Sequence, residues 1–194
     1  MTSLTDIKTK INFGHVCILP TETVYGIACR ADHPASIDRI YAIKGRDFDK
    51  PLAVCVRDLE AAKQLAQFDE IATRLANEFW PGALTLVLPV QNKTLDPRCY
   101  LSETIALRCP DIEWREEFEQ PLALTSANTS GEPAATTAET GLDVDEVLDT
   151  GPSREKIPST ILLVQGGKIK CLREGALKAD ALSAYDINLS LIHI

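Results

Sequence analysis

Hydrophobic residues recur along the N-terminal part of the chain with the spacing of a helix first and of buried strands afterwards. Ile7 and Ile11 lie four residues apart within an otherwise polar stretch, which predicts a short amphipathic helix. The runs 16–19 and 24–29 are rich in β-branched and other apolar residues, and Pro20 lies between them. These runs predict two buried strands that are joined by a polar bend.

The same patterns extend over the rest of the sequence. Helical spacing of apolar residues and short apolar runs predict helices at 36–43, 59–66, 70–79, 114–119 and 138–148 and strands at 52–56, 84–88, 104–109, 122–125, 160–164 and 168–172. Gly166-Gly167 stands between the last two strands and predicts a two-residue hairpin turn. Helical crossovers together with a hairpin indicate an α/β (α+β) fold with a twisted mixed sheet and packed helices, rather than a purely parallel sheet.

Length and composition favour one domain. The chain has 194 residues, of which 45% are hydrophobic, and this is enough for one sizeable core but cramped for two. We expect a single domain over residues 1–188. The polar N-terminal segment and the lack of an apolar run of membrane-spanning length predict a cytoplasmic protein with no membrane contact.

The last six residues, 189–194, read Leu-Ser-Leu-Ile-His-Ile. One reading frame of a common sequencing-library adapter encodes this peptide, so we hypothesise that the tail is not native. In that case the natural chain would continue after Asn188, and a C-terminal domain could follow there.

Charge and cysteine usage argue against several classes of function. The chain carries 20 basic and 28 acidic residues, and its net charge of −8 opposes nonspecific binding to nucleic acid. The six cysteines include no C-x-x-C pair, so neither a zinc site nor a redox motif is indicated. The sequence also lacks a G-x-x-x-x-G-K-[ST] phosphate loop, a G-x-G-x-x-G fingerprint and an H-E-x-x-H helix. Any phosphate chemistry must therefore use another scaffold, and no metal-ligating residues are predicted.

Four polar segments at predicted strand and helix ends are candidates for a site. Hydroxyl groups gather at 20–26 and 125–131, three cations lie within 44–50, and a fourth group combines 158–160 with 172–175. Lysine and arginine close together suit a triphosphate, and small polar side chains at strand ends suit a bound ligand. Taken singly, each segment is better explained by ordinary turns, caps or surface charge.

In combination and in this order, the segments resemble the YrdC/TsaC family of threonylcarbamoyl-AMP synthases. The similarity covers about residues 7–175, and the ordered set of motifs is highly specific although one motif alone would mean little. The matching motifs are Pro-Thr-Glu-Thr-Val-Tyr-Gly at 20–26, Lys-Gly-Arg at 44–46, Lys-Pro-Leu at 50–52, Trp-Pro-Gly at 80–82, Arg108 before Pro110, Thr-Ser-Ala-Asn at 125–128, Pro-Ser-Thr at 158–160 and Leu-Arg-Glu-Gly at 172–175.

The resemblance implies a ligand cleft on the concave face of the sheet and assigns residues to it. For ATP it implies contacts from Lys44, Arg46, Lys50, Ser126, Asn128 and Arg173, among which Lys44 and Arg46 are the catalytic candidates. For threonine it implies contacts from Thr23, Arg108 and Ser159, with Thr104 beside the pocket. Cys55 is a departure, because longer relatives often carry His there, and one wall of the threonine pocket is therefore in question.

The resemblance further implies a reaction. L-threonine, bicarbonate and ATP, the last with Mg²⁺, would give threonylcarbamoyl-AMP and pyrophosphate for the threonylcarbamoyladenosine modification of tRNA, and partner proteins would transfer the group to tRNA. Lys44, Arg46 and Arg173 would neutralise the reacting anions. Arg108 would clamp the threonine carboxylate through two parallel bonds. Glu22 is a candidate helper in deprotonating the amine, although a structural role is favoured.

Two other functions stay open at this point. The same fold with a basic concave face can bind double-stranded RNA by its shape, so an RNA-binding module without synthase activity is the main alternative. The acidic net charge counts against it, and direct RNA contact is undecided for a synthase as well. The second alternative is the related carbamoyl-adenylate chemistry of hydrogenase maturation, which normally belongs to a much longer multidomain chain.

Overall fold

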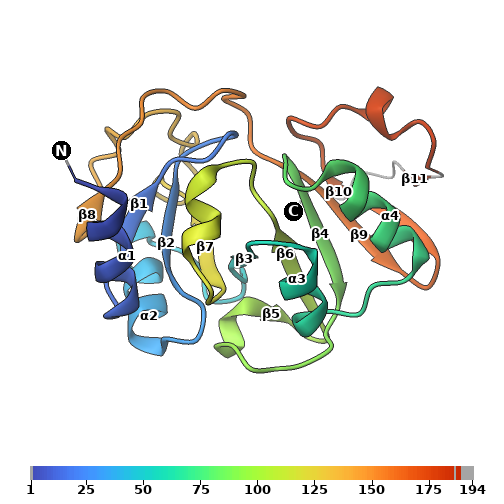
Figure 1. The fold of residues 1–194 in the computed structure, drawn as a ribbon, viewed down its shortest axis with the longest axis horizontal. Helices are drawn as coiled ribbons and strands as arrows, with labels where there is room; N and C mark the ends of the chain where they lie inside the picture. The colour runs from blue at the N-terminus through green and yellow to red at the C-terminus, as the bar shows by residue number, and fades with distance from the viewer. Residues whose placement is uncertain (1, 186, 189–194) are drawn as a thin grey trace.

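The computed structural model describes residues 2–185 and 187–188, so the tail at 189–194 and the hypothesis about its origin lie outside the described residues. Within the described part, eleven strands form one mixed sheet (Figure 1). The strands are β1 (Cys17–Leu19), β2 (Gly26–Arg30), β3 (Ala53–Cys55), β4 (Leu84–Pro89), β5 (Tyr100–Leu101), β6 (Thr104–Arg108), β7 (Leu122–Ser126), β8 (Glu146–Val147), β9 (Thr160–Gln165), β10 (Lys168–Arg173) and β11 (Ile187–Asn188). The α-helices are α1 (Leu4–Asn12), α2 (Pro34–Lys44), α3 (Leu59–Leu65) and α4 (Glu70–Phe79).

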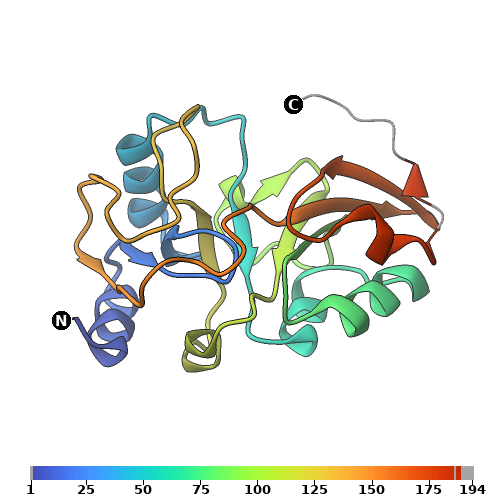
Figure 2. The ribbon, with the colours of Figure 1, turned by 90° about the horizontal axis from the view of Figure 1, so that it is seen from above.

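Neighbouring strands of the sheet come from distant parts of the chain. The strand order is β11-β10-β9-β4-β6-β3-β7-β2-β1-β8, and β5 pairs with β6 outside this path. The pairs β1–β8, β3–β6, β4–β9 and β10–β11 are parallel, and the others are antiparallel. After β8 the chain crosses the molecule to reach β9, as both ribbon views show (Figure 1 and Figure 2). This crossing places β9 beside β4.

Alternate positions along the strands face two apolar cores, as the two-residue period of a strand requires. Ile27, Val54 and Leu107 belong to the larger core, which also contains apolar side chains of α2, α3 and α4. Leu122 belongs to a smaller core, together with Trp114 and apolar side chains of α1. The sheet twists along its length, and Figure 2 shows α2 and the α3–α4 pair near opposite ends of the molecule and on different sides of the view.

Local chemistry at the helix ends determines where the site residues are placed. Asp58 and Asp69 accept hydrogen bonds from backbone N–H groups of the first turn and so begin α3 and α4. Gly45 ends α2 in the left-handed conformation with φ of 58°, which glycine adopts without steric cost. Lys44 is thereby fixed as the last residue of α2, next to the loop that follows β7.

Most predicted elements are confirmed, with boundaries that move by at most two residues, and the Gly166-Gly167 turn joins β9 to β10. The predicted helix at 138–148 is wrong, because most of this segment is irregular and its end forms β8. The Asp145 carboxylate accepts a hydrogen bond from the backbone N–H of Val16 at 2.8 Å and pairs with Arg39. These bonds draw the segment alongside β1, where strand pairing replaces helical hydrogen bonds.

Short elements account for the other differences. The predicted helix at 114–119 is a 3₁₀ segment at Glu113–Glu117, and the two-residue strands β5, β8 and β11 were not predicted because so few residues leave no periodic pattern. Among the described residues, no helix has the length and apolar character that spanning a bilayer requires.

Candidate active site

Arg108, at the C-terminal end of β6, is the centre of a buried polar cluster. Its Nη2 donates a hydrogen bond to Thr23 Oγ1 at 2.7 Å and lies 2.8 Å from Glu22 Oε1. All three residues are at most 6% exposed, so water screens this ion pair little. The contact with Glu22 lacks hydrogen-bond geometry, and within the described residues neither Glu22 oxygen nor Arg108 Nε has a hydrogen-bond partner. Charge rather than hydrogen bonding therefore holds the pair together.

Ser159 and Arg173 form the other half of this cluster, where β9 begins and β10 ends. Arg173 donates to the Ser159 carbonyl from Nε at 3.1 Å and from Nη2 at 2.8 Å. Ser159 Oγ lies 2.8 Å from Thr85 Oγ1, and Thr85 stands opposite Arg108 in the register of β4 and β6. We call the linked set the arginine cluster; it consists of Glu22, Thr23, Thr85, Arg108, Ser159 and Arg173.

The electrostatics of the arginine cluster favour an anion. Surrounding protein atoms exclude water from the Arg173 guanidinium and lower its pKa, and the nearby positive charge of Arg108 lowers that pKa further. The Arg173 residue nevertheless keeps an exposed face. Arg108 contacts the buried Glu22 carboxylate, whereas Arg173 adds a second positive charge nearby, so the set has excess positive charge and a ligand with a negative end would relieve the repulsion.

The loop 20–25, which contributes to this cluster, is held by other segments of the fold. The Trp114 indole N–H donates to the carbonyl of Pro20 at 2.6 Å, and the backbone N–H of Glu155 donates to the carbonyl of Glu22 at 2.8 Å. Both bonds join the loop to parts of the chain that are far away in sequence. The side chains of the loop are therefore positioned before any ligand arrives.

A second group of site residues surrounds Lys44 at the end of α2. Lys44 is 1% exposed, and its Nζ donates to the backbone carbonyls of Ser126 and Asn128, just after β7. The backbone N–H of Ser130 donates in turn to the Lys44 carbonyl at 2.8 Å. An ammonium group has three N–H donors, so one of them has no hydrogen-bond partner among the described residues.

Arg46 completes this second group, which we call the lysine cluster and which consists of Lys44, Arg46, Ser126 and Asn128. Arg46 Nε and Nη2 each donate at 3.0 Å, to the carbonyls of Lys50 and Pro51. Burial lowers the pKa of Lys44 to about 8, and the positive charge of Arg46 adds to the effect. Among the described residues neither Lys44 nor Arg46 forms an ion pair, and the nearby Asp47 carboxylate, whose pKa is lowered by Lys50 and to a smaller extent by Arg46, pairs with Lys50 instead.

Strand β7 separates the two clusters, and the loop 20–25 bridges them. At the start of β7, Leu122 pairs with Cys55, which also pairs with Arg108 across β3 and β6. At its end, Ser126 pairs with Gly26, the residue that follows the loop. Thr23 contacts Arg108, and Gly26, three residues later, pairs with Ser126, so this short segment links the two clusters.

Asn128 supports the shape of the lysine cluster. Its Nδ2 donates to the carbonyls of Thr129 and Glu132, each at 2.8 Å, and so fixes the turn after β7. Its Oδ1 is buried and has no hydrogen-bond partner within the described part of the chain. The amide group therefore keeps one acceptor free.

Two predicted site residues are not brought into either cluster. Lys50 is exposed, and its Nζ pairs with Asp47 at 2.8 Å, while only its backbone carbonyl contacts Arg46. Thr104 begins β6, four residues before Arg108, and its hydroxyl donates to the carbonyl of Leu101 at 2.9 Å. A rise of about 3.3 Å per strand residue puts it about 13 Å from the arginine cluster.

Cys55 forms an uncharged wall of the arginine cluster. It stands opposite Arg108 in the register of β3 and β6 and is 4% exposed. Burial raises the pKa of its thiol to about 12, although Arg108 opposes the shift. At the position that the sequence comparison with the family pattern predicted to be a departure, this chain therefore presents a small neutral side chain.

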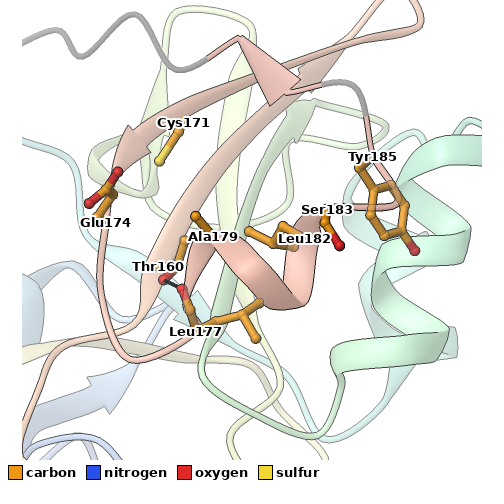
Figure 3. A pocket seen from close by; sticks show the side chains of 8 residues that line it. All are labelled: Thr160, Cys171, Glu174, Leu177, Ala179, Leu182, Ser183 and Tyr185. Atoms are coloured by element: carbon orange, nitrogen blue, oxygen red, sulfur yellow. Dashed lines mark hydrogen bonds between the residues drawn. The ribbon is translucent and has the colours of Figure 1, made fainter.

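A cavity of about 140 Å³ is lined by residues of β9, of β10 and of the segment that follows β10 (Figure 3). Its lining is largely apolar and includes Leu177, Leu182 and Tyr185. Thr160 lines it and donates to the carbonyl of Leu177 at 2.7 Å, whereas the preceding residue, Ser159, bonds to the arginine cluster. No residue of either cluster lines this cavity, so it is separate from the site.

Reasoning from the sequence did not find Thr85, and it expected Arg108 to have more nitrogens available for a ligand than the structure shows. Thr85 lies inside an otherwise apolar strand, and its single hydroxyl was the available signal. Arg108 was expected to clamp a carboxylate through two parallel bonds, but its Nη2 is engaged by Thr23 and Glu22 and its Nε is buried. Only Nη1 is neither bonded within the described residues nor buried, so the guanidinium presents one nitrogen to a ligand.

Comparisons with known proteins show what the chain is similar to. The model of the Sua5/YciO/YrdC family, described as telomere recombination, matches residues 9–175. Threonylcarbamoyl-AMP synthase of Bacillus subtilis is 37% identical, over 87% of this chain and 52% of the relative. Threonylcarbamoyl-AMP synthase of Mus musculus is 32% identical, over 94% of this chain and 70% of the relative.

A solved structure gives the same result in three dimensions. Sua5 of Pyrococcus abyssi, crystallised in complex with L-threonine, superposes with a TM-score of 0.88 and is 31% identical. The superposition covers 97% of this chain and 60% of the other. The present chain therefore spans little more than half the length of the Bacillus and Pyrococcus proteins.

Proposed function

The chain belongs to the Sua5/YciO/YrdC family, and from this membership we propose that it is a threonylcarbamoyl-AMP synthase. It would join L-threonine, carbon dioxide from bicarbonate, and ATP into threonylcarbamoyl-AMP and pyrophosphate. The observation that carries the proposal is the pair of cation clusters at the two ends of β7, bridged by the loop 20–25. One cluster suits an amino-acid carboxylate and the other a polyphosphate.

The proposed reaction has two bond-forming steps. The amine nitrogen of threonine attacks the carbon of carbon dioxide, loses a proton and becomes a carbamate. A carbamate oxygen then attacks the α-phosphorus of ATP, and the bond from that phosphorus to the oxygen bridging to the β-phosphorus breaks, so pyrophosphate leaves. Because an anion approaches a polyanion, fixed positive charge must offset their repulsion.

The residues of the two clusters have separate roles in this proposal. Arg108 Nη1 would bind the threonine carboxylate, with Thr23 and Ser159 holding the guanidinium groups around it. The free N–H of Lys44 and the exposed edge of Arg46 would bind the phosphates, and Ser126 and Asn128 would contact the nucleotide. Arg173 would lie between the two substrates, where the carbamate meets the α-phosphorus. Orientation of the two anions is then the main catalytic device.

Magnesium would enter with ATP and not through a resident site. Among the described residues, no group of three or more His, Cys, Asp or Glu side chains could hold a metal ion. The lysine cluster consists of cations and neutral polar groups, which do not fit a magnesium ion. We therefore propose Mg²⁺ as part of the nucleotide substrate, bound by its phosphates.

The mixed anhydride that forms would be labile in water, so proteins that transfer the threonylcarbamoyl group to tRNA are proposed partners. Bicarbonate is likewise the proposed source of the carbon. The alternative of an RNA-binding module is less well supported, because the net charge is −8 and the relatives are named as synthases.

Pyrophosphate release tests the proposal. Purified protein would be mixed with ATP, magnesium, each of several amino acids, and bicarbonate that is present or withheld. We expect release that depends on threonine and bicarbonate together. Release that is indifferent to threonine would overturn the assignment, and tight, steeply salt-dependent RNA binding without ATP turnover would favour the RNA-binding module.

A further inference from the structure

Glu22 carries a buried charge that the proposed chemistry does not use. It is 4% exposed, and within the described residues neither of its carboxylate oxygens accepts a hydrogen bond. A carboxylate that merely braced Arg108 would be expected to form two well-directed bonds with it. Here one contact of 2.8 Å lacks hydrogen-bond geometry, and Arg108 Nε is left without an acceptor. The cost of burying this carboxylate calls for a role in binding.

The charges around Glu22 are few and can be named. Arg108 contacts it, and Arg173 lies close enough to Arg108 to affect its electrostatics. The thiols of Cys55 and Cys109 are also near, but burial raises their pKa values to about 12 and about 11, so both stay neutral. Among the described residues, Glu22 is thus the one carboxylate in contact with Arg108, and Arg173 adds a second positive charge close to Arg108.

Glu22 reduces the preference of the arginine cluster for a simple anion, although the two arginines still leave the cluster with excess positive charge. A carboxylate beside Arg108 weakens the attraction of Arg108 for any anion, including phosphate and bicarbonate. The same carboxylate attracts a positive group placed next to that anion. A ligand that has both charges on neighbouring atoms, such as an α-amino acid in its zwitterionic form, therefore matches the field of the Glu22–Arg108 pair.

We propose that Glu22 is a specificity-determining residue, whose buried negative charge makes the Arg108 subsite select an amino-acid zwitterion over a simple carboxylate. It acts through its field, because its oxygens have no surface for direct contact. The inference rests on the proposed function, since it assumes that the amino acid binds at Arg108. It deepens that function by assigning the recognition of the ammonium group to this chain.

The test compares two ligands that differ in the ammonium group alone. L-Threonine and 3-hydroxybutanoate share the carboxylate, the hydroxyl and the carbon skeleton, and the dissociation constant of each would be measured by calorimetry without ATP. In the wild-type protein we expect threonine to bind more tightly. Selectivity is the dissociation constant of 3-hydroxybutanoate divided by that of threonine. In Glu22→Gln this ratio should fall roughly tenfold or more, because the attraction for the ammonium group is lost while the attraction for the carboxylate grows.

Two further variants distinguish an electrostatic role of Glu22 from a structural one. Glu22→Asp keeps the charge and should keep most of the selectivity. Glu155→Gln is the matched control, because it makes the same change at an exposed residue whose backbone N–H bonds to Glu22, and it should leave the ratio unchanged. Equal weakening of both ligands in Glu22→Gln would mean a structural role and would overturn the inference.

The wild-type protein keeps the inference testable even where Glu22→Gln does not fold. Equal affinity of the wild type for threonine and 3-hydroxybutanoate would overturn it without any variant. ATP affinity and threonine-dependent pyrophosphate release would be measured on the same samples. Normal pyrophosphate release with an unchanged ratio in Glu22→Gln would refute the role of Glu22 and leave the synthase assignment intact, whereas absent release from the wild type would refute that assignment.

Discussion

The two clusters of the site are built in different ways. The arginine cluster lies where strands β6 and β10 end against the loop 20–25, this loop is tied to distant segments, and the central cation is paired with a buried carboxylate. The lysine cluster lies where a helix meets a loop, and its cations are held by backbone carbonyls without an ion pair among the described residues. The contrast teaches how charge balance would follow the proposed ligands: a net-neutral amino acid would meet the Glu22–Arg108 pair, and a polyanion would meet cations that form no ion pair among the described residues.

Removing Arg108 should have the largest effect of the changes considered, and this effect should fall on the arginine cluster. Arg108→Ala leaves Glu22 as an uncompensated buried charge, so we expect a loss of about 3–5 kcal/mol in the free energy of unfolding, together with loss of threonine binding. Denaturant titration and calorimetry measure the two effects. Arg154→Ala removes an exposed arginine that pairs with Asp111 and should cost less than about 1 kcal/mol. Similar costs for the two variants would contradict the buried pairing.

Removing Lys44 should affect the nucleotide end alone. Lys44→Ala deletes a cation that bonds two carbonyls, so we expect a stability loss of about 2 kcal/mol and roughly 100-fold weaker ATP binding. Threonine affinity, measured without ATP, should stay within about threefold of the wild type. Lys10→Ala, in the last turn of α1, is the control for a lysine outside the site. A large loss of threonine affinity in Lys44→Ala would show that the two clusters are not separate.

The pH dependence of ATP binding tests whether the charge of Lys44 contributes to the affinity of the lysine cluster. Because the pKa of Lys44 is lowered to about 8, its charge is present below that pH and is lost above it. ATP affinity should therefore fall above pH 8, by at most about tenfold per pH unit. Lys44→Arg keeps its charge throughout and should give a flat profile between pH 7 and pH 9.5, even where its affinity is lower. A flat profile in the wild type would contradict the role of Lys44.

Lys50 offers the smallest expected effect. It is exposed and paired with Asp47, so Lys50→Ala should change the free energy of unfolding by less than about 1 kcal/mol and ATP affinity by less than about threefold. Calorimetry beside Lys44→Ala makes the comparison direct. A loss as large as that of Lys44→Ala would support the place beside the phosphates that the sequence motif predicts for this residue.

Patterns in the sequence predicted the positions of the longer strands more accurately than the structure of the segment between β7 and β9. Long apolar runs such as 84–88 and 122–125 located their strands because a buried strand needs little beyond apolar residues. The segment 138–148 failed because its structure depends on Asp145 bonding to Val16, a contact between residues that are far apart in sequence. Local propensity does not contain such a contact.

In the candidate site, too, contacts between residues that are distant in sequence were the part that was not predicted. The ordered motifs predicted Arg108, Ser159 and Lys44 as site residues, and the structure places each in contact with another residue of the predicted set. Thr85 and the side-chain contact of Glu22 became apparent through strand register and burial, neither of which a motif encodes. Spatial neighbours that are distant in sequence were the part that could not be foreseen.

The order in which the site is assembled has a consequence during protein synthesis. Ser159 and Arg173 close the arginine cluster from β9 and β10, and β9 lies beside β4 only after the long crossing that follows β8. A nascent chain therefore has no complete pocket until the residues through Gly175 have left the ribosome. Products that are truncated before that point would contain most of the sheet and yet be unable to hold both substrates.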